Sequence, residues 1–376
     1  MTRNNGKIKV LHILPFLNKG GGTERIVYDL LSRINPMVFD RKICVTHKPA
    51  DDFQAVRFNT AGIDVYELPK KENRRDRFIG LFKHLRANDF NIAHVHTYDG
   101  NENHARFACV LARVPAIITH DHRFAYWNDR PVLNVIWSLL NLFTYRNIAA
   151  SETCGDFRRK CCLWQKDKVI IINNGVALDL FRPPSYAEKR GLKASIGINP
   201  DAFVIGAVGR LVEVKQFGLF IQAAAHFRHN KNLVFILAGE GPLERELKGM
   251  AKKNKLENIH FLSWREEIAK IFKCMDVFVM SSEFHEGFGL VTAEAMASGI
   301  PIVALNSPNH VKVVTPECGV FVGSTPSDIA EGIKRIMLDK DLALRLSIKA
   351  RQRAIDFFDI NRAVKELEEL YLCATR

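Results

Sequence analysis

The sequence predicts an α/β protein made of two doubly wound, Rossmann-like domains. Short apolar runs of strand length, such as Ile8–Pro15 and Val204–Gly209, alternate with segments of helical composition. Glycine-rich turns follow several of these runs, as Gly20-Gly21-Gly22 and Gly239-Glu240-Gly241 do. At 376 residues the chain is long enough to bury two separate cores.

The composition is that of an ordinary globular protein, with 47% hydrophobic and 25% charged residues. The polar N-terminal segment Met1–Lys7 lacks the pattern of a secretory signal. The longest apolar-rich region, Pro131–Tyr145, is too short to span a bilayer and is expected to form a core or interface helix. The eight cysteines form no CxxC pair, so we expect buried thiols in a reducing cytosol.

The formal net charge is +13, and most of the basic excess falls in residues 1–185. An anionic membrane surface, an acidic acceptor or a nucleic acid would each fit this charge. A nucleic-acid-binding protein is expected to show aromatic and basic residues interleaved, or a known reader motif, and the sequence shows neither.

In the first domain, the strand Ile8–Pro15 leads into a glycine-rich turn and a helix for which Thr23 is a plausible cap. Such a turn can hold a phosphate. It lacks the GxGxxG spacing and the GK[ST] ending, so a dinucleotide site or a Walker loop is disfavoured. Further strands are predicted at Arg41–Thr46 and Ile63–Leu68.

The segment Lys70–Arg86 combines a basic lead-in with apolar residues on one helical face. This composition fits a helix lying on an anionic membrane. It equally fits an amphipathic helix that packs on the sheet and exposes a basic edge.

Histidines gather near the ends of two predicted strands, Phe90–Thr97 and Val114–Arg123. Ligands of open α/β sheets bind at the carboxyl ends of strands. A metal site is disfavoured there because neither cysteines nor an HExxH spacing accompany the histidines.

The second domain begins with a strand that ends at Gly209, followed by Arg210 and Lys215 in a loop. Two cations beside an open strand end suit a diphosphate. Further strands are predicted at Leu233–Ala238 and Ile259–Trp264.

The most informative stretch runs from Met275 to Ala304. An apolar strand leads into a turn with Gly287 and Gly289, and an Ala-rich helix follows at Leu290–Ala297. The helix N-terminus offers free N–H groups to an anion. Glu286 and Glu294, with seven residues between them, are suited to accept hydrogen bonds from the hydroxyls of a nucleotide sugar.

This stretch resembles the Glu-x7-Glu signature of glycosyltransferase family 4, the group 1 retaining glycosyltransferases of GT-B fold. The resemblance covers nearly the whole chain: Ile148–Glu152 looks like the family's last N-domain strand, and Val169–Pro184 is similar to its crossing between domains. Gln216, Ser263 and Leu305–His310 depart from the family pattern. The resemblance implies two Rossmann-like domains facing a central cleft. It assigns residues 1–185 to acceptor binding, 186–356 to the nucleotide sugar, and 357–376 to a helix that returns to the N-terminal domain.

The resemblance also implies roles for individual residues. His120 and Glu286 are expected to act in catalysis, with His122 as the alternative to His120 for facing the donor sugar. Glu24, His122 and Asn174 are expected on the acceptor or sugar side. No metal is expected. The expected donor-binding residues are Gly21, Gly22, Arg210, Lys215, Glu286, Gly287, Phe288, Gly289, Leu290, Val291 and Glu294.

The implied reaction moves a sugar, with retention, from a nucleotide diphosphate sugar to a hydroxyl of a glycan or lipid-linked acceptor. The donor is expected to be a UDP-sugar, with a GDP-sugar as the alternative, and no other cofactor is expected. The implied setting is lipopolysaccharide or other cell-surface polysaccharide synthesis, by a cytoplasmic protein bound peripherally at the inner membrane face. The alternatives are a sugar-nucleotide epimerase of the same fold, or a basic nucleic-acid-binding protein.

Overall fold

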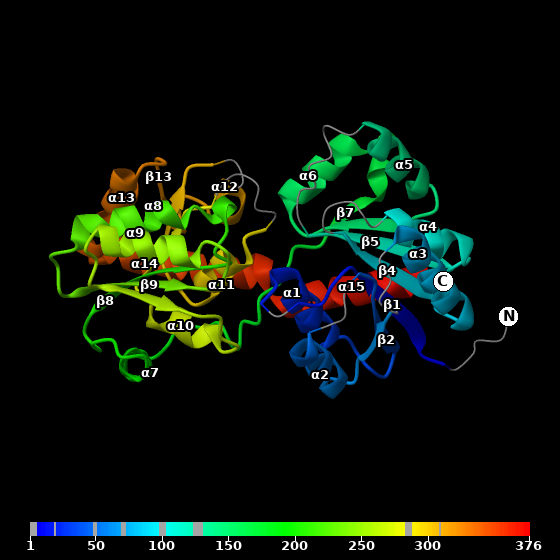
Figure 1. Ribbon diagram of the computed structural model, residues 1–376, viewed down its shortest axis with the longest axis horizontal. Coiled ribbons are helices and arrows are strands. Elements are labelled where there is room, and N and C mark those ends of the chain that lie inside the picture. The colour runs from blue at the N-terminus through cyan, green and yellow to red at the C-terminus, as the bar shows by residue number, and fades with distance from the viewer. Residues whose placement is uncertain are drawn as a thin grey trace. The chain divides into compact units, whose positions relative to one another are not determined.

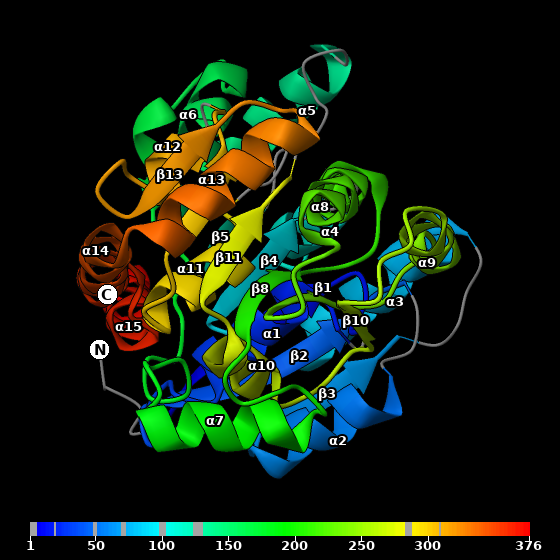
Figure 2. The same cartoon turned by 90° about the vertical axis from the view of Figure 1, so that its left-hand side faces the viewer.

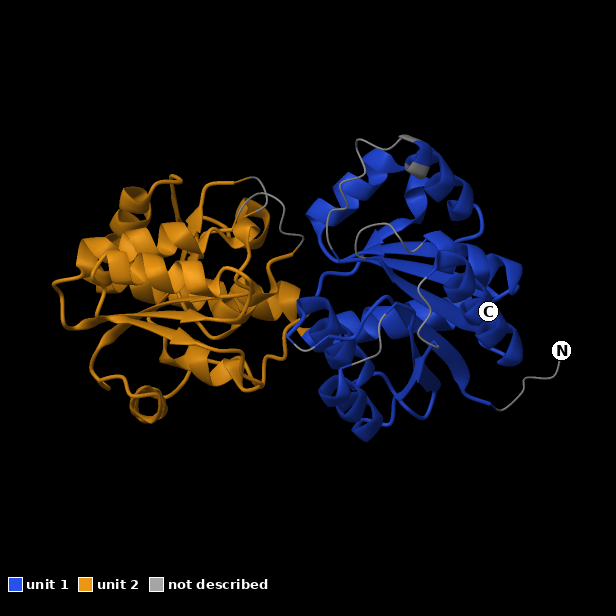
Figure 3. Ribbon diagram, viewed as in Figure 1, with its two compact units in different colours: residues 1–174, 360–376 blue, residues 175–359 orange. Residues whose placement is uncertain are grey.

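The computed structural model of the protein describes residues 6–18, 20–47, 51–68, 73–97, 103–122, 131–282, 288–307 and 310–376. Contacts divide the chain into two compact units (Figure 3). Unit 1 comprises residues 1–174 and 360–376, and unit 2 comprises residues 175–359. Each unit holds one parallel sheet with interleaved helices (Figure 1), which confirms the predicted fold class.

The sheet of unit 1 has the strand order β3-β2-β1-β4-β5-β6-β7. The structure corrects one prediction, because β7 lies beyond the strand that was expected to be the last. The strands are β1 (Ile8–Leu14), β2 (Phe39–Val45), β3 (Asp64–Glu67), β4 (Ile92–Thr97), β5 (Ala116–Asp121), β6 (Arg146–Ala149) and β7 (Val169–Ile171).

Seven α-helices are described in unit 1. They are α1 (Gly22–Leu31), α2 (Asp52–Thr60), α3 (Arg74–Ala87), α4 (Asn103–Leu111), α5 (Pro131–Asn141), α6 (Glu152–Cys161) and α15 (Ile360–Ala374). Gly21, not Thr23, is the N-cap of α1, and no side chain caps that end. The apolar face of α3 packs on the sheet core, where Leu81 and Leu85 are buried, so this face belongs to the core of the unit.

The sheet of unit 2 has the order β10-β9-β8-β11-β12-β13. Its strands are β8 (Phe203–Val208), β9 (Leu233–Ala238), β10 (Ile259–Leu262), β11 (Val277–Met280), β12 (Ile302–Leu305) and β13 (Gly319–Val322). Its helices are α7 (Tyr186–Ser195), α8 (Phe217–Ala224), α9 (Glu244–Lys253), α10 (Ile268–Cys274), α11 (Leu290–Ala297), α12 (His310–Val313), α13 (Pro326–Leu338) and α14 (Lys340–Phe358).

Both faces of the unit 2 sheet are apolar, because alternate strand residues point to opposite faces. One face packs against α8, α9 and α13, and the other against α10, α11 and α14 (Figures 1 and 2). The helix predicted at Leu290–Ala297 is confirmed as α11. α14 ends at Phe358, and α15 of unit 1 begins two residues later at Ile360.

Candidate active site

The strand order of unit 2 reverses between β8 and β11. From β8 the chain continues to β9 and β10 on one side, whereas β11, β12 and β13 follow on the other. Open α/β sheets bind ligands at such a switch point, at the carboxyl ends of the strands. The site predicted from sequence lies at these strand ends, because Arg210 and Lys215 follow β8 and α11 follows β11.

The loops after β8 and β9 touch each other closely. Gly239 has φ +147°, and a Cβ atom there would lie 1.9 Å from the carbonyl oxygen of Gly209. Any larger residue would push these two strand ends apart. The loop after β8 is also tied to β11, since Ser281 Oγ donates to the carbonyl oxygen of Lys215 at 2.8 Å. Arg210 is exposed and Lys215 half-buried, so this cationic loop is held at the switch point.

The N-terminus of α11 completes this part of the site. Gly289 caps the helix with φ +76°, a left-handed conformation that favours glycine. Phe288 is buried and Leu290 and Val291 are half-buried, so the first turn is packed into the unit core. Glu294 lies on the same helix and is 1% exposed. Glu286 and Gly287 lie outside the described residues.

Unit 1 has its own switch point between β1 and β4. The glycine turn follows β1, and Glu24 of α1 is buried there. A Cβ atom on Gly21 would lie 1.9 Å from Glu24 Oε2, whereas Gly22 has open space around it. The turn therefore presents backbone beside a carboxylate. Asn174 ends the unit, with its side chain buried and its backbone N–H donating to Ala150.

Five histidines occupy one face of β1, β4 and β5, next to this switch point. They are His12, His94, His96, His120 and His122, and none is more than 7% exposed. The strand register places His12 beside His94 and His96 beside His120. We call this group the histidine cluster.

A chain of hydrogen bonds runs through the histidine cluster to α15. Tyr371 Oη lies 2.6 Å from His94 Nδ1 and 3.2 Å from His12 Nε2. His12 Nδ1 lies 2.9 Å from His96 Nε2, and His96 Nδ1 lies 2.9 Å from His122 Nε2. His120 stands apart, because neither of its ring nitrogens has a hydrogen-bond partner among the described residues.

The environment keeps four of these imidazoles, those of His12, His94, His96 and His120, neutral at pH 7. Burial, with smaller contributions from His120 and Arg41, lowers the pKa of His12 to about 3. Burial lowers the pKa of His120 to about 4, opposed by the Asp121 carboxylate. Burial and the neighbouring histidines lower the pKa of His94 and that of His96 well below the usual value. Burial raises the pKa of Tyr371, so its hydroxyl stays protonated.

The sequence predicts histidines at these two strand ends but does not reveal that His12 and Tyr371 join them. A signal was present: the pattern His-x-His occurs on both predicted strands, at 94–96 and 120–122. In a doubly wound sheet these strands are neighbours, so alternate residues meet on one face. The sequence also misses the buried ion pair in which Arg158 donates to Asp121 at 2.6 and 2.7 Å.

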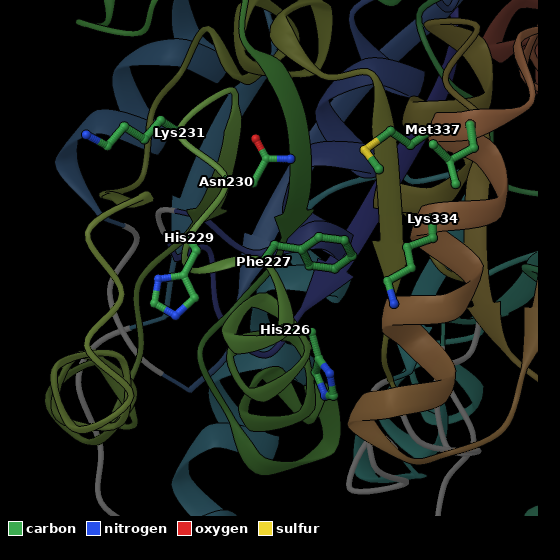
Figure 4. Close-up of a pocket in the computed structure, with 8 residues that line it drawn as sticks. His226, Phe227, His229, Asn230, Lys231, Lys334 and Met337 are labelled. Atoms are coloured by element: carbon green, nitrogen blue, oxygen red, sulfur yellow. The ribbon is translucent and has the colours of Figure 1, made fainter.

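A surface hollow in unit 2 lies elsewhere, lined in part by His229, Lys231 and Lys334 (Figure 4). His229 and Lys231 precede β9, so this hollow is at the amino end of the strands, opposite the switch point. It brings together none of the residues predicted for the site.

Within the described residues, no helix is long and apolar enough to cross a membrane. Helix α5 and the turn beside it nevertheless expose a group of large apolar side chains. The turn is adjacent to α5 because Leu163 N–H donates to Ser138 and Asn141 donates to the carbonyl oxygen of Trp164. We call this group the α5 patch; it comprises Val132, Val135, Ile136, Leu139, Leu142, Phe143, Leu163 and Trp164, each 40% or more exposed.

Two Rossmann-like units, each with a switch point at the carboxyl ends of its parallel strands, are the architecture of the GT-B fold. Comparison with known families agrees with this class. The model of group 1 glycosyl transferases matches residues 188–353, and the model of glycosyltransferase family 4 matches residues 20–180. The chain belongs to the family 4, group 1 glycosyltransferases, and it is a glycosyltransferase of GT-B fold.

Similar proteins include an Escherichia coli UDP-Gal:alpha-D-GlcNAc-diphosphoundecaprenol alpha-1,3-galactosyltransferase, 26% identical over 99% of this chain and 98% of the relative. The putative glycosyltransferase EpsF of Bacillus subtilis is 29% identical over 81% of this chain and 80% of its own. Among solved structures, Anabaena HepE in complex with UDP and glucose has a TM-score of 0.82 at 20% identity, with 96% and 98% of the two chains covered. At this identity the structural likeness concerns the fold.

Proposed function

We propose that this glycosyltransferase moves a sugar, with retention of anomeric configuration, from a UDP-sugar to a hydroxyl of a lipid-linked glycan. The observation that carries the proposal is the meeting of Arg210, Lys215 and the α11 N-terminus at the switch point of unit 2. A UDP-galactose-dependent relative that acts on a diphosphoundecaprenol-linked sugar supports the donor and acceptor classes. A GDP-sugar remains the alternative donor.

In this proposal the leaving diphosphate is neutralised by protein groups. Arg210 binds it bidentately, Lys215 adds a second positive charge, and the α11 N-terminus donates backbone N–H groups. Glu294 accepts hydrogen bonds from the ribose, and Glu286 accepts them from the donor sugar. We assign no metal to the donor diphosphate and no protein nucleophile to the reaction.

Unit 1 is proposed to bind the acceptor and to face the sugar. Of the two candidates beside the donor sugar, the structure favours His120. The ring of His122 is held by His96, whereas both ring nitrogens of His120 lack partners among the described residues. His120 would therefore donate to or accept from a sugar hydroxyl without losing an existing hydrogen bond. Glu24 and Asn174 remain candidates on the acceptor side.

The α5 patch is proposed to rest on the cytoplasmic face of an anionic membrane, where a lipid-linked acceptor of a cell-surface polysaccharide or lipopolysaccharide would be found. Residues 131–144 carry no charged side chain, whereas Arg146 follows closely in the chain and Lys168 donates to the carbonyl oxygens of Asn141, Leu142 and Thr144. An apolar surface beside basic residues fits the interface of a bilayer with anionic lipid. We therefore propose α5, rather than α3, as the membrane-facing helix.

Donor binding is tested by thermal unfolding with a panel of nucleoside diphosphates and their sugars, without metal. A ligand of the folded state raises its stability. UDP is expected to raise the melting temperature of the native protein, and Arg210→Ala and Glu294→Ala are expected to lose this shift. Transfer to a diphosphate-linked lipid acceptor is expected to fall on the order of 100-fold in Arg210→Ala.

Matched controls are Arg228→Ala and Glu246→Ala, which remove exposed side chains of the same types away from the switch point. Both are expected to keep the UDP shift. No shift with any diphosphate, with or without Mg²⁺, would reject the donor site, and release of free UDP without a transfer product would favour an epimerase. NMR of the product then reports whether the anomeric configuration is retained.

Membrane docking is tested by sedimentation with vesicles that contain anionic phospholipid. Leu139→Glu with Phe143→Glu is expected to abolish binding, whereas Leu344→Glu, at a similarly exposed position on α14, is expected to leave it intact. Equal binding by both variants would rule out the α5 patch as the docking surface.

A further inference from the structure

Two strands of unit 1 bring two His-x-His pairs side by side. Residues two apart on a strand point to the same face, so His94 and His96 of β4 lie on the same face as His120 of β5 and His122 just after it. The ring centroids of His120 and His122 are 4.2 Å apart, and that of His96 is 5.6 and 5.2 Å from them. Three imidazoles therefore converge where β4 and β5 end.

The positions of the ring nitrogens suit a shared ligand. In His96, His120 and His122, the nearest ring nitrogens all lie within 4.8 Å of one another. Both nitrogens of His120 are buried and have no partner among the described residues. A neutral imidazole carries one donor and one acceptor, so this ring leaves both without a partner among the described residues, which destabilises the folded unit. A ligand that fills this position would remove that cost.

We infer that His96, His120 and His122 bind one divalent transition-metal ion of the Zn²⁺ class. Neutral imidazole is a ligand for Zn²⁺, Cu²⁺, Ni²⁺ and Fe²⁺, whereas Mg²⁺ and Ca²⁺ prefer oxygen ligands, and the group formed by the described residues consists of imidazoles alone. Three protein nitrogens leave a fourth tetrahedral position open, as in catalytic zinc sites. This site is separate from the donor diphosphate site of unit 2.

Small movements suffice for coordination. His96 Nδ1 and His122 Nε2 are 2.9 Å apart, the spacing of a hydrogen bond. Two nitrogens of a tetrahedral zinc site with bonds of about 2.0–2.1 Å lie roughly 3.3 Å apart. The two rings would thus separate by a few tenths of an ångström, and His120 would turn or shift toward them.

The hydrogen-bond chain behind His96 can accommodate the tautomer that coordination would require. With a metal on His96 Nδ1, the imidazole proton of His96 would sit on Nε2 and would be donated to His12 Nδ1. His12 then donates from Nε2 to Tyr371 Oη, and the Tyr371 hydroxyl donates to His94 Nδ1. His96, His12, Tyr371 and His94 would each keep one proton. Metal binding would therefore reverse the direction of the hydrogen bonds without changing the net charge of these four side chains. His12 and Tyr371 orient the ligand His96 from behind, as the outer partners of metal-bound histidines do.

Occupation of this site has a consequence that rests on the proposed function. If His120 faces the donor sugar, an ion that binds His120 withdraws it from that role. Zn²⁺ is then expected to inhibit glycosyl transfer, and a chelator is expected to restore it. Binding of the ion itself does not depend on this role and is measured separately.

The test uses the full-length protein stripped with a chelator, which is then titrated with Zn²⁺ by calorimetry and with Co²⁺ by visible absorption. We expect one ion per chain and a Co²⁺ spectrum of four-coordinate, nitrogen-ligated metal. His96→Gln and His122→Gln are expected to lose this binding, and His226→Gln and His229→Gln, in unit 2, to retain it. His12→Ala keeps the three ligands and is expected to weaken Zn²⁺ binding about 10–100-fold through loss of the outer partner.

Circular dichroism identifies any variant that fails to fold, and His12→Ala together with the spectrum of the native protein then decides the matter. A stoichiometry well below one ion per chain, or binding that is the same in the folded His96→Gln and His122→Gln variants, would overturn the inference. Binding of Zn²⁺ with full transfer activity would keep the metal site and reject the role of His120 at the donor sugar. Stabilisation by UDP tests the donor site of unit 2 independently of Zn²⁺ binding and of the role of His120.

Discussion

Unit 1 and unit 2 share a parallel sheet covered by helices, but they fill the space beside their sheets differently. In unit 2 both sheet faces are apolar, and the ion pairs of Asp276 lie at the amino end of the central strand β11, with 21% of that side chain exposed. In unit 1 one face packs against an apolar core, whereas the histidine cluster covers part of the other. A buried ion pair, Asp121 with Arg158, lies close by. The same fold thus has a histidine-lined sheet face in unit 1 and two apolar sheet faces in unit 2.

The difference shows what each unit is specialised to do. An apolar core stabilises unit 2 and leaves its surface loops free to bind ligands. Arg210 and Lys215, which we propose to bind the donor, lie on such a loop after β8. Buried imidazoles and charges lower stability unless each is paired, so a fold retains them only when they are satisfied or used. Unit 1 therefore combines its structural core with its candidate chemistry, and we expect it to respond more strongly to pH and to substitution than unit 2.

The largest expected effect is acid destabilisation confined to unit 1. The unfolded chain binds a proton at His12 and His120 near pH 6.5, but the folded unit does so only at about pH 3 and about pH 4. Stability is therefore full above pH 6.5 and is lost as the pH falls from 6.5 toward 4. Each histidine contributes about 1.4 kcal/mol per pH unit in this window, so the two together contribute about 3 kcal/mol per pH unit.

Amide hydrogen exchange resolves this effect by unit. Protein held at each pH with a chelator is pulse-labelled at one fixed pH, and peptides of the two units are compared by mass spectrometry. Between pH 6.5 and 5, protection is expected to fall in β1, β4 and β5 and to persist in β8, β9 and β11. Loss of protection in parallel in both sheets would contradict the comparison.

The next effect comes from the ion pairs. Asp121→Ala leaves the Arg158 guanidinium charged and 3% exposed, so we expect a loss of about 3–5 kcal/mol in the stability of unit 1. Asp276→Ala removes a carboxylate that binds Lys189, Lys193 and the Val204 N–H of unit 2, but water reaches it. We expect a loss of about 1–2 kcal/mol there.

Amide hydrogen exchange at increasing urea concentration, compared between peptides of unit 1 and unit 2, measures both losses of stability. Asp121→Asn is a useful intermediate, because it keeps a hydrogen-bond acceptor for Arg158 while removing the charge. Equal losses for Asp121→Ala and Asp276→Ala would show that burial of the pair in unit 1 makes no difference.

The sequence predicted unit 2 more completely than unit 1, for a physical reason. The predicted helix Leu290–Ala297 and the loop with Arg210 and Lys215 follow from local patterns: apolar runs, glycine turns and cations within a few residues. Their roles at the donor came from the family resemblance and stay proposals. The fold class itself followed from the alternation of strands and helices along the whole chain.

The histidine cluster depends on contacts that no local pattern contains. His12, His96 and Tyr371 are brought together by strand order and by the return of α15, over separations of 84 and 359 residues. The expectation that no metal binds rested on the lack of known short motifs, which does not consider pairs on neighbouring strands. The predicted N-cap of α1, Thr23, was wrong because the helix already begins at Gly22, with the backbone of Gly21 as its N-cap.

The smallest effect compares one buried hydroxyl in each unit. Tyr371→Phe removes the group that joins His94 Nδ1 to His12 Nε2, and both nitrogens are fully buried. A buried polar group left without a partner costs about 1–3 kcal/mol. Thr292→Val in α11 removes a hydroxyl whose partner is Met280 Sδ at 3.1 Å. Sulfur is a weak acceptor and no buried donor is left without a partner, so we expect a loss below about 1 kcal/mol.

Exchange protection of β1 and β4 in Tyr371→Phe, and of β11 in Thr292→Val, measures the two losses of stability. If Tyr371→Phe is as mild as Thr292→Val, the hydrogen-bond chain contributes little to unit 1, because its histidines then find other partners or water.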